Sequence, residues 1–213
     1  MTADSLPPYD LRTAVRHLKR ADPVLATLIT GVGPCRLQMR AYPHPFEALL
    51  HAIVFQQLSG KAAATIFGRL AALFPPQQGI SPAGLLKLSD EALRAAGLSR
   101  NKTLAVRDLA LKARQGVVPD LRELAALSDD EIVARLTTVR GIGRWTVEML
   151  LIFTLGRPDV LPVDDLGVRK GFRAAYGMRK LPAASTLVRA GKGWAPYRSV
   201  ASWYLWRAAD MGK

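Results

Sequence analysis

The sequence predicts an all-α fold with two helical lobes, and three observations support this prediction. Apolar residues recur at helical spacing along the chain, and two of these runs follow a Ser-Asp pair, at 89–90 and 128–129, that is typical of a helix start. Proline, glycine and asparagine separate the runs. No segment alternates between apolar and polar residues as a half-buried strand would. About ten or eleven helices are therefore expected.

In chain order, a polar tail of residues 1–8 comes first. The predicted helices cover residues 10–19, 22–30, 46–57, 59–74, 85–97, 103–114, 129–138, 145–155, a segment opening at 164–165, and 197–209. A chain of 213 residues is long enough to bury a sizeable core. We expect one domain over residues 1–213, in which lobe one spans about 45–160 and lobe two combines 1–44 with 161–213. An active-site cleft is expected between the lobes.

The charge balance indicates a polyanionic partner. The chain has 30 Lys and Arg against 17 Asp and Glu, a net charge of +13. From Leu136 onward there are 13 basic and 5 acidic residues, so +8 of this charge lies in the last 78 residues. A concentrated positive field of this kind favours DNA.

A membrane surface is the alternative partner, and the sequence argues against it. It has no basic amphipathic helix with an aromatic face, no apolar run near about 18 residues and no signal pattern. We therefore expect a soluble, cytoplasmic monomer, associated with the nucleoid if it is bacterial.

Two glycines mark the first candidate site. Gly141 and Gly143 stand one residue apart, ahead of a strongly helix-forming stretch. A glycine turn that feeds a helix start presents backbone N–H groups at the positive end of the helix dipole, which suits a phosphate. Arg140 and Arg144 add full charges, and Ile142 at the tip is expected to pack between the two helices. An ordinary helix–helix turn is the alternative, but the flanking arginines and the net charge favour phosphate binding.

Two aspartates mark the second candidate site. Asp164 and Asp165 follow a proline and precede an apolar-periodic run, which is also a plain N-cap signature. Since one cap is enough, we predict Asp164 as the cap and Asp165 in the first turn, as a carboxylate that faces the cleft. Cys35 is the only cysteine, so no disulfide framework, zinc site or iron–sulfur cluster is expected.

The motif Gly-Ile-Gly-Arg-Trp-Thr at 141–146, a hydrophobic helix and Leu-Pro-Val-Asp-Asp-Leu at 161–166 together resemble the helix–hairpin–helix DNA glycosylase superfamily. Within it, the chain is similar to the 3-methyladenine DNA glycosylase II branch, which removes alkylated bases. The likeness includes residues 46–64 and 194–207 and covers roughly residues 45–210. Fuller members of this branch carry an N-terminal β lobe, for which this compact chain has no room.

The resemblance implies contacts with double-stranded DNA that holds an alkylated base. Leu58 would be the wedge that fills the gap left by a flipped base, although a leucine packed on the core is the alternative. Gln57 would approach the opposite strand, and Lys61 would contact a phosphate unless it is simply a solvated charge. At the hairpin, the DNA contacts would come from Gly141, Gly143, Thr146, Arg140 and Arg144.

The resemblance also implies the chemical groups. Asp165 would stabilise an oxocarbenium-like transition state or activate the attacking water, and the sequence leaves both roles open. The base pocket would contain Trp145, Met149 and Trp206, while Trp203 is expected in the core. Lyase-capable relatives have a lysine where this chain has Trp145, so we expect a monofunctional enzyme with water as the nucleophile. No cofactor would be required, but Na⁺ or K⁺ could bind the backbone carbonyls of Thr137, Val139 and Ile142 when DNA is bound.

These implications describe an enzyme of base excision repair that flips a base of the 3-methyladenine type and hydrolyses its N-glycosidic bond. An N-alkylated purine is cationic and leaves readily, so aromatic stacking and one carboxylate would be sufficient. One alternative is a glycosylase for oxidised or mismatched bases, although such relatives usually have the hairpin lysine or a cysteine cluster. The other is a non-enzymatic helix–hairpin–helix module that only binds DNA.

Overall fold

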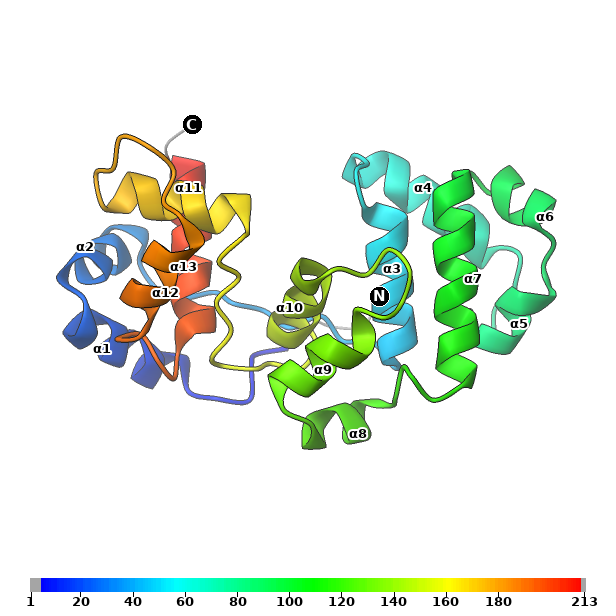
Figure 1. Ribbon diagram of the computed structural model, residues 1–213, viewed down its shortest axis with the longest axis horizontal. Coiled ribbons are helices and arrows are strands. Elements are labelled where there is room, and N and C mark those ends of the chain that lie inside the picture. The colour runs from blue at the N-terminus through cyan, green and yellow to red at the C-terminus, as the bar shows by residue number, and fades with distance from the viewer. Residues whose placement is uncertain (1–4, 212–213) are drawn as a thin grey trace. The chain divides into compact units, whose positions relative to one another are not determined.

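The computed structural model describes residues 5–211, whose regular secondary structure is helical apart from one isolated β-bridge between Ser5 and Met39. It contains thirteen helices and no sheet (Figure 1), which confirms the all-α prediction. The chain divides into two compact units. We name them the terminal unit, Met1–Ala41 with Leu151–Lys213, and the central unit, Tyr42–Leu150.

The central unit contains seven complete helices and most of an eighth. They are α3 (Pro45–Phe55), α4 (Gly60–Ala71), α5 (Pro82–Lys87), α6 (Asp90–Ala95), α7 (Arg100–Arg114), α8 (Leu121–Ala126), α9 (Asp129–Leu136) and α10 (Arg144–Phe153), whose last turn belongs to the terminal unit. Each helix from α4 to α9 begins with a Ser or Asp whose side chain accepts the N–H three residues later. These caps satisfy amide groups that the helices themselves leave unpaired.

Helix α7 organises the central unit. It packs against α3, α5 and α6 and runs between α3 and the α5–α6 pair (Figure 1). Its Arg107 donates to the Leu88 carbonyl at 2.6 Å and pairs with Asp90 at 2.5 Å, so one guanidinium joins the end of α5 to the start of α6. The same helix carries the residues that hold the hairpin.

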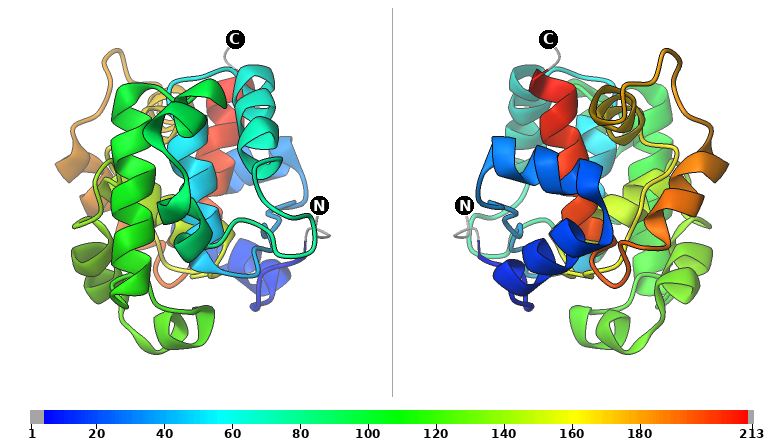
Figure 2. Two further views of the ribbon diagram at one scale, coloured as in Figure 1. Left: turned by 90° about the vertical axis from the view of Figure 1, so that its right-hand side faces the viewer. Right: turned by 90° about the vertical axis from the view of Figure 1, so that its left-hand side faces the viewer.

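The terminal unit is built around α13 (Arg198–Met211). The other helices are α1 (Leu11–Ala21), α2 (Pro23–Val32), α11 (Leu166–Ala175) and α12 (Ala184–Gly191). α13 packs against α11, α2 and α1, and the right-hand view of Figure 2 shows the blue α1 and α2 against the red α13. The core of this unit consists of Ala14, Leu18, Leu25, Ile29, Val168, Phe172, Leu187, Trp194, Val200, Ala201, Tyr204 and Leu205.

A polar network joins three parts of the terminal unit at Asp22. One carboxylate oxygen caps α2 by accepting the Val24 and Leu25 N–H groups. The other accepts Tyr176 OH at 2.5 Å and Trp194 Nε1–H at 3.0 Å. Partial burial raises the pKa of Asp22, but these hydrogen bonds outweigh burial and hold the pKa below its usual range.

Several predicted element boundaries were wrong. The single helix predicted over residues 85–97 is two helices, because Leu88 is extended and Ser89 caps a new helix start. Helices α8 and α12 were not predicted; α8 has only six residues, and the N-cap of α12 makes no side-chain hydrogen bond. In the structure, the second boundary between the two units falls at Leu150. The last turn of α10 belongs to the terminal unit, where the Phe153 carbonyl accepts Arg40 N–H at 2.6 Å.

Candidate active site

Asp165 is the N-cap of α11. Its Oδ1 atom accepts the Val168 N–H at 2.7 Å, and the helix begins at Leu166. The predicted assignment of the cap to Asp164 is therefore wrong. A turn in which Asp165 N–H donates to the Pro162 carbonyl at 3.0 Å brings Asp165 to the helix start and leaves Asp164 exposed.

The same carboxylate oxygen receives a second donor from another helix. Trp206 on α13 donates its indole Nε1–H to Asp165 Oδ1 at 2.8 Å. The half-buried indole stacks on Phe153, with ring centroids 5.6 Å apart and planes inclined by 28°. Two donors on one oxygen restrict rotation of the carboxylate, and the positive end of the α11 dipole lies beside it.

Close packing of α11 against α13 sets the position of this pair. A Cβ atom at Gly171 would lie 1.7 Å from the carbonyl oxygen of Leu205, so only glycine fits at this crossing. The backbone of α11 can therefore approach α13 directly, which fixes the helix start that carries Asp165.

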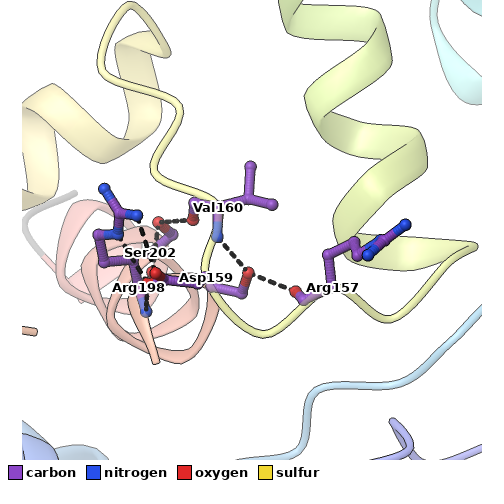
Figure 3. A network of polar contacts seen from close by, with 6 residues as sticks. Arg157, Asp159, Val160, Arg198 and Ser202 are labelled. Carbon is purple, nitrogen blue, oxygen red and sulfur yellow. Dashed lines mark hydrogen bonds and ion pairs between the residues drawn. The ribbon is translucent and has the colours of Figure 1, made fainter. Parts of the chain in front are cut away.

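The loop that precedes α11 is fastened to the start of α13 (Figure 3). Arg198 makes a two-point ion pair with Asp159, with Nε–Oδ1 at 2.7 Å and Nη2–Oδ2 at 2.8 Å. Ser199 Oγ donates to the Arg157 carbonyl at 2.6 Å and accepts the Val160 N–H at 3.0 Å. Paired charge-assisted hydrogen bonds fix both the orientation and the distance of the two side chains. The loop that leads to Asp165 is therefore held in place against the start of α13.

The hairpin between α9 and α10 has the expected glycine geometry at one of its two glycines. Gly141 adopts φ +79°, and a Cβ there would lie 3.2 Å from the Cβ of Ala105. Gly143 does not adopt a positive φ. Ile142 is buried, Arg140 is exposed, and α10 begins immediately afterwards, so the positive end of its dipole lies at the hairpin.

Two charged residues of α7 hold the entrance of the hairpin. Asp108 Oδ2 accepts the Arg140 N–H at 2.7 Å and Lys112 Nζ at 2.9 Å. Lys112 also donates to the Thr138 carbonyl. Partial burial raises the pKa of Asp108, but the bonds from Arg140 and Lys112 outweigh it and lower the pKa below its usual range. The carboxylate is therefore charged at neutral pH.

The turn between α3 and α4, residues 56–59, is the predicted wedge, and we name it the wedge turn. Gln57 adopts φ +57°, a backbone region that residues other than glycine rarely occupy, and Leu58 is 40% exposed. Lys102 of α7 donates to the carbonyls of Val54 at 2.6 Å and Gln56 at 2.9 Å. The last carbonyls of α3 are thus capped by an ammonium group, whose pKa burial lowers.

The wedge turn and the hairpin are tied together within the central unit. The side-chain amide of Gln56 donates to the Gly141 carbonyl at 2.9 Å. Lys102, Ala105 and Asp108 follow one another at three-residue spacing on α7, so one stripe of this helix meets both elements.

The sequence that forms these features matches a known protein family. The family described as "HhH-GPD superfamily base excision DNA repair protein" matches residues 50–196.

The chain belongs to this HhH-GPD superfamily.

Relatives of known name agree with the family match. DNA-3-methyladenine glycosylase 1 of Schizosaccharomyces pombe is 37% identical over 202 residues, covering 94% of this chain and 89% of that protein. A solved structure of a 3-methyladenine DNA glycosylase from the same organism, in complex with abasic DNA, has a TM-score of 0.78 at 36% identity, covering 92% of this chain and 95% of the other. A DNA-3-methyladenine glycosidase of Bacillus halodurans has a TM-score of 0.83 at 38% identity, covering 92% and 88%.

The remaining side chains predicted for the HhH-GPD site differ in their exposure. Trp145 is 49% exposed, Met149 is half-buried and Lys61 is exposed. Thr146, predicted as a DNA contact, is 5% exposed. Trp203, predicted in the core, is half-buried and packs against the core cluster of the terminal unit, with the Arg207 guanidinium 5.4 Å from its ring centroid.

The predicted cation site of this HhH-GPD member consists of carbonyl oxygens from one turn. The Val139 carbonyl accepts the Ile142 N–H at 3.0 Å and has a second lone pair for a ligand. Neutral carbonyl oxygens are suitable ligands for an alkali cation. Over residues 5–211, no group of three or more His, Cys, Asp or Glu is placed to hold a metal ion. No helix in that range has the length and apolarity to cross a membrane.

Four residues that support the HhH-GPD site were missed in the sequence. Gln56, Lys102, Asp108 and Lys112 hold the wedge turn and the hairpin. The last three lie on one side of α7, and this spacing is the only feature of the sequence that could have pointed to them. Charged residues at such spacing usually mark a solvated helix face, so the pattern alone does not reveal their partners.

Proposed function

We propose that the protein is a DNA glycosylase that hydrolyses the N-glycosidic bond of alkylated bases, of the 3-methyladenine type, in double-stranded DNA. This reaction is the first step of base excision repair. The observation that carries the proposal is the Asp165 carboxylate, held by two donors at the start of α11. It occurs in a superfamily member that is 37% identical, over 94% of its length, to a 3-methyladenine glycosylase.

In the proposed reaction, the damaged nucleotide leaves the base stack and its C1′–N bond breaks. Positive charge develops on the sugar as the base departs with the bonding electrons. Asp165 stabilises this charge or takes a proton from the water that attacks C1′. A methylated purine is already cationic, so it departs as a neutral base without strong acid catalysis.

The hairpin and the wedge turn of the central unit supply several of the proposed DNA contacts. The hairpin amides and Arg140 bind phosphates, and Leu58 on the wedge turn enters the space vacated by the flipped base. Trp145 stacks on the cationic base, and Met149 adds an adaptable apolar surface. A Na⁺ or K⁺ ion at the carbonyls of the hairpin stays part of this proposal.

Substitution of Asp165 by Asn tests the proposal. Asparagine also caps helices and can accept hydrogen bonds from Val168 N–H and Trp206, so the fold is expected to survive while the charge is lost. We expect base release from duplex DNA methylated with dimethyl sulfate to fall by about 100-fold or more. Released 3-methyladenine and 7-methylguanine would be measured by chromatography.

Asp164→Asn is the matched control, because Asp164 is the exposed neighbour and its substitution removes the same charge. It should release bases at the wild-type rate. A wild-type protein that releases no methylated base would disprove the glycosylase, whereas loss of activity in Asp164→Asn alone would show that Asp165 is not the catalytic carboxylate.

A further inference from the structure

The edge of the Trp206 indole contacts Asp165, whereas a face of the ring contacts another side chain. The Nε1–H donor lies in the plane of the ring and points at Asp165 Oδ1, 2.8 Å away. One face of the indole stacks on Phe153. A base could stack only on the opposite face of the indole. Such stacking does not explain the hydrogen bond that the indole N–H donates to Asp165.

We propose that Trp206 is a positioning residue that acts on the reaction through Asp165. The inference rests on the proposed function of Asp165. The sequence predicted Trp206 as part of the base pocket, and the inference adds a second role for the same side chain. The Val168 N–H comes from the same helix as Asp165, and the indole N–H comes from α13. Donors from two directions on one oxygen fix the plane of the carboxylate, so it needs no reorientation as charge develops on the sugar.

The glycine two residues after Asp165 makes room for this contact. A Cβ atom at Gly167 would lie 2.7 Å from Trp206 Cδ1 and 3.0 Å from Asp165 Oδ1. Gly167 is inside a helix and has no positive φ, so its backbone does not require glycine. The space that glycine leaves is filled by the indole at hydrogen-bond distance from the carboxylate.

A spectroscopic experiment tests the hydrogen bond without reference to activity. In ¹⁵N-labelled protein, we expect the indole N–H of Trp206 to exchange with water more slowly than that of half-buried Trp203. Asp165→Asn should shift the Trp206 signal, because a neutral oxygen is a weaker acceptor, and should leave the Trp203 signal in place. Trp206→Phe assigns the signal. If the Trp206 indole signal has the same position in Asp165→Asn as in the wild type, the inference is wrong.

A kinetic experiment separates positioning from stacking. Trp206→Phe retains an aromatic ring beside Phe153 and lacks the N–H donor. We expect its single-turnover base release from methylated duplex DNA to slow by about tenfold or more, with affinity for abasic duplex DNA within about threefold of wild type. Trp203→Phe, the matched control on the same helix, should behave as wild type.

Gly167→Ala offers an independent route to the same result, since it alters neither partner. It should slow base release as Trp206→Phe does and should shift the Trp206 indole signal. If Trp206→Phe is as fast as wild type while Trp206→Leu is slow, the residue acts by stacking and the inference is wrong. Failure of Asp165→Asn to slow the reaction would instead refute the role proposed for Asp165, while the indole signal still reports on the hydrogen bond.

Discussion

Trp145 shows how one residue restricts the chemistry. It follows the hairpin directly, at the position where the resemblance places a lysine in lyase-capable relatives. The indole is 49% exposed and has no amine that could attack C1′ and form a Schiff base. In the proposed reaction water is therefore the nucleophile, and we expect a free base and an intact abasic strand as the products.

We expect borohydride to trap no covalent complex between this protein and abasic duplex DNA. The reagent reduces a Schiff base to a stable amine, which would appear as a shifted band on a denaturing gel. A bifunctional glycosylase on the same DNA serves as the positive control. A trapped adduct, for example through the exposed Lys170 on α11, would show that a lysine reaches the sugar and that the protein is not monofunctional.

Among the helices, α7 acts as a spacer between the wedge turn and the hairpin. Lys102 caps the end of α3, while Asp108 binds the hairpin backbone further along the same helix. A helix rises about 1.5 Å per residue, so this arrangement holds both elements at a set separation. Gln57 is kept at positive φ beside this cap, which places the neighbouring Leu58 at the surface.

Lys102→Met should weaken the wedge turn, because it keeps the aliphatic stem and removes the donor to two carbonyls. We expect the free energy of unfolding to fall by about 1–2 kcal/mol and base release to slow. Denaturant titration and single-turnover kinetics would measure these effects. Arg114→Met removes one exposed charge from the same helix and is the control. Equal effects in both variants would mean that Lys102 acts only through net charge.

Over the whole molecule, the positive charge is distributed unevenly. The terminal unit has 17 basic and 7 acidic residues, a net charge of +10, while the central unit has 13 and 10, a net charge of +3. The unit that carries Asp165 therefore holds most of the charge, and the unit that carries the hairpin holds little. Four exposed cations lie on α11 and the loop after it, namely Lys170, Arg173, Arg179 and Lys180.

Replacement of these four cations by alanine should weaken binding to duplex DNA and reduce its salt dependence. The slope of log K against log salt is expected to fall by about 0.9 for each phosphate that the variant no longer neutralises. The control replaces four exposed cations of α1, Arg12, Arg16, Lys19 and Arg20, and changes the net charge by the same amount. Fluorescence anisotropy over a salt series would measure both. Equal slopes for the two variants would show that only the overall field matters.

The fold class, the glycine turn of the hairpin and the helix start at Asp164 and Asp165 could be predicted from the sequence. Helix caps, apolar spacing and glycine are local signals, because each acts within one or two turns of the chain. Local signals were less reliable for short elements such as α8 and α12, which depend on packing for their stability.

The identity of the capping aspartate, and of the distant side chains that hold it, required the folded structure. A turn at Pro162 selects Asp165 over its neighbour, and Trp206, 41 residues further along, donates to its oxygen. Lys102 reaches the wedge turn across 46 to 48 positions of sequence. Such contacts join segments whose spacing in the chain follows no period, so their partners become visible only when the helices are packed.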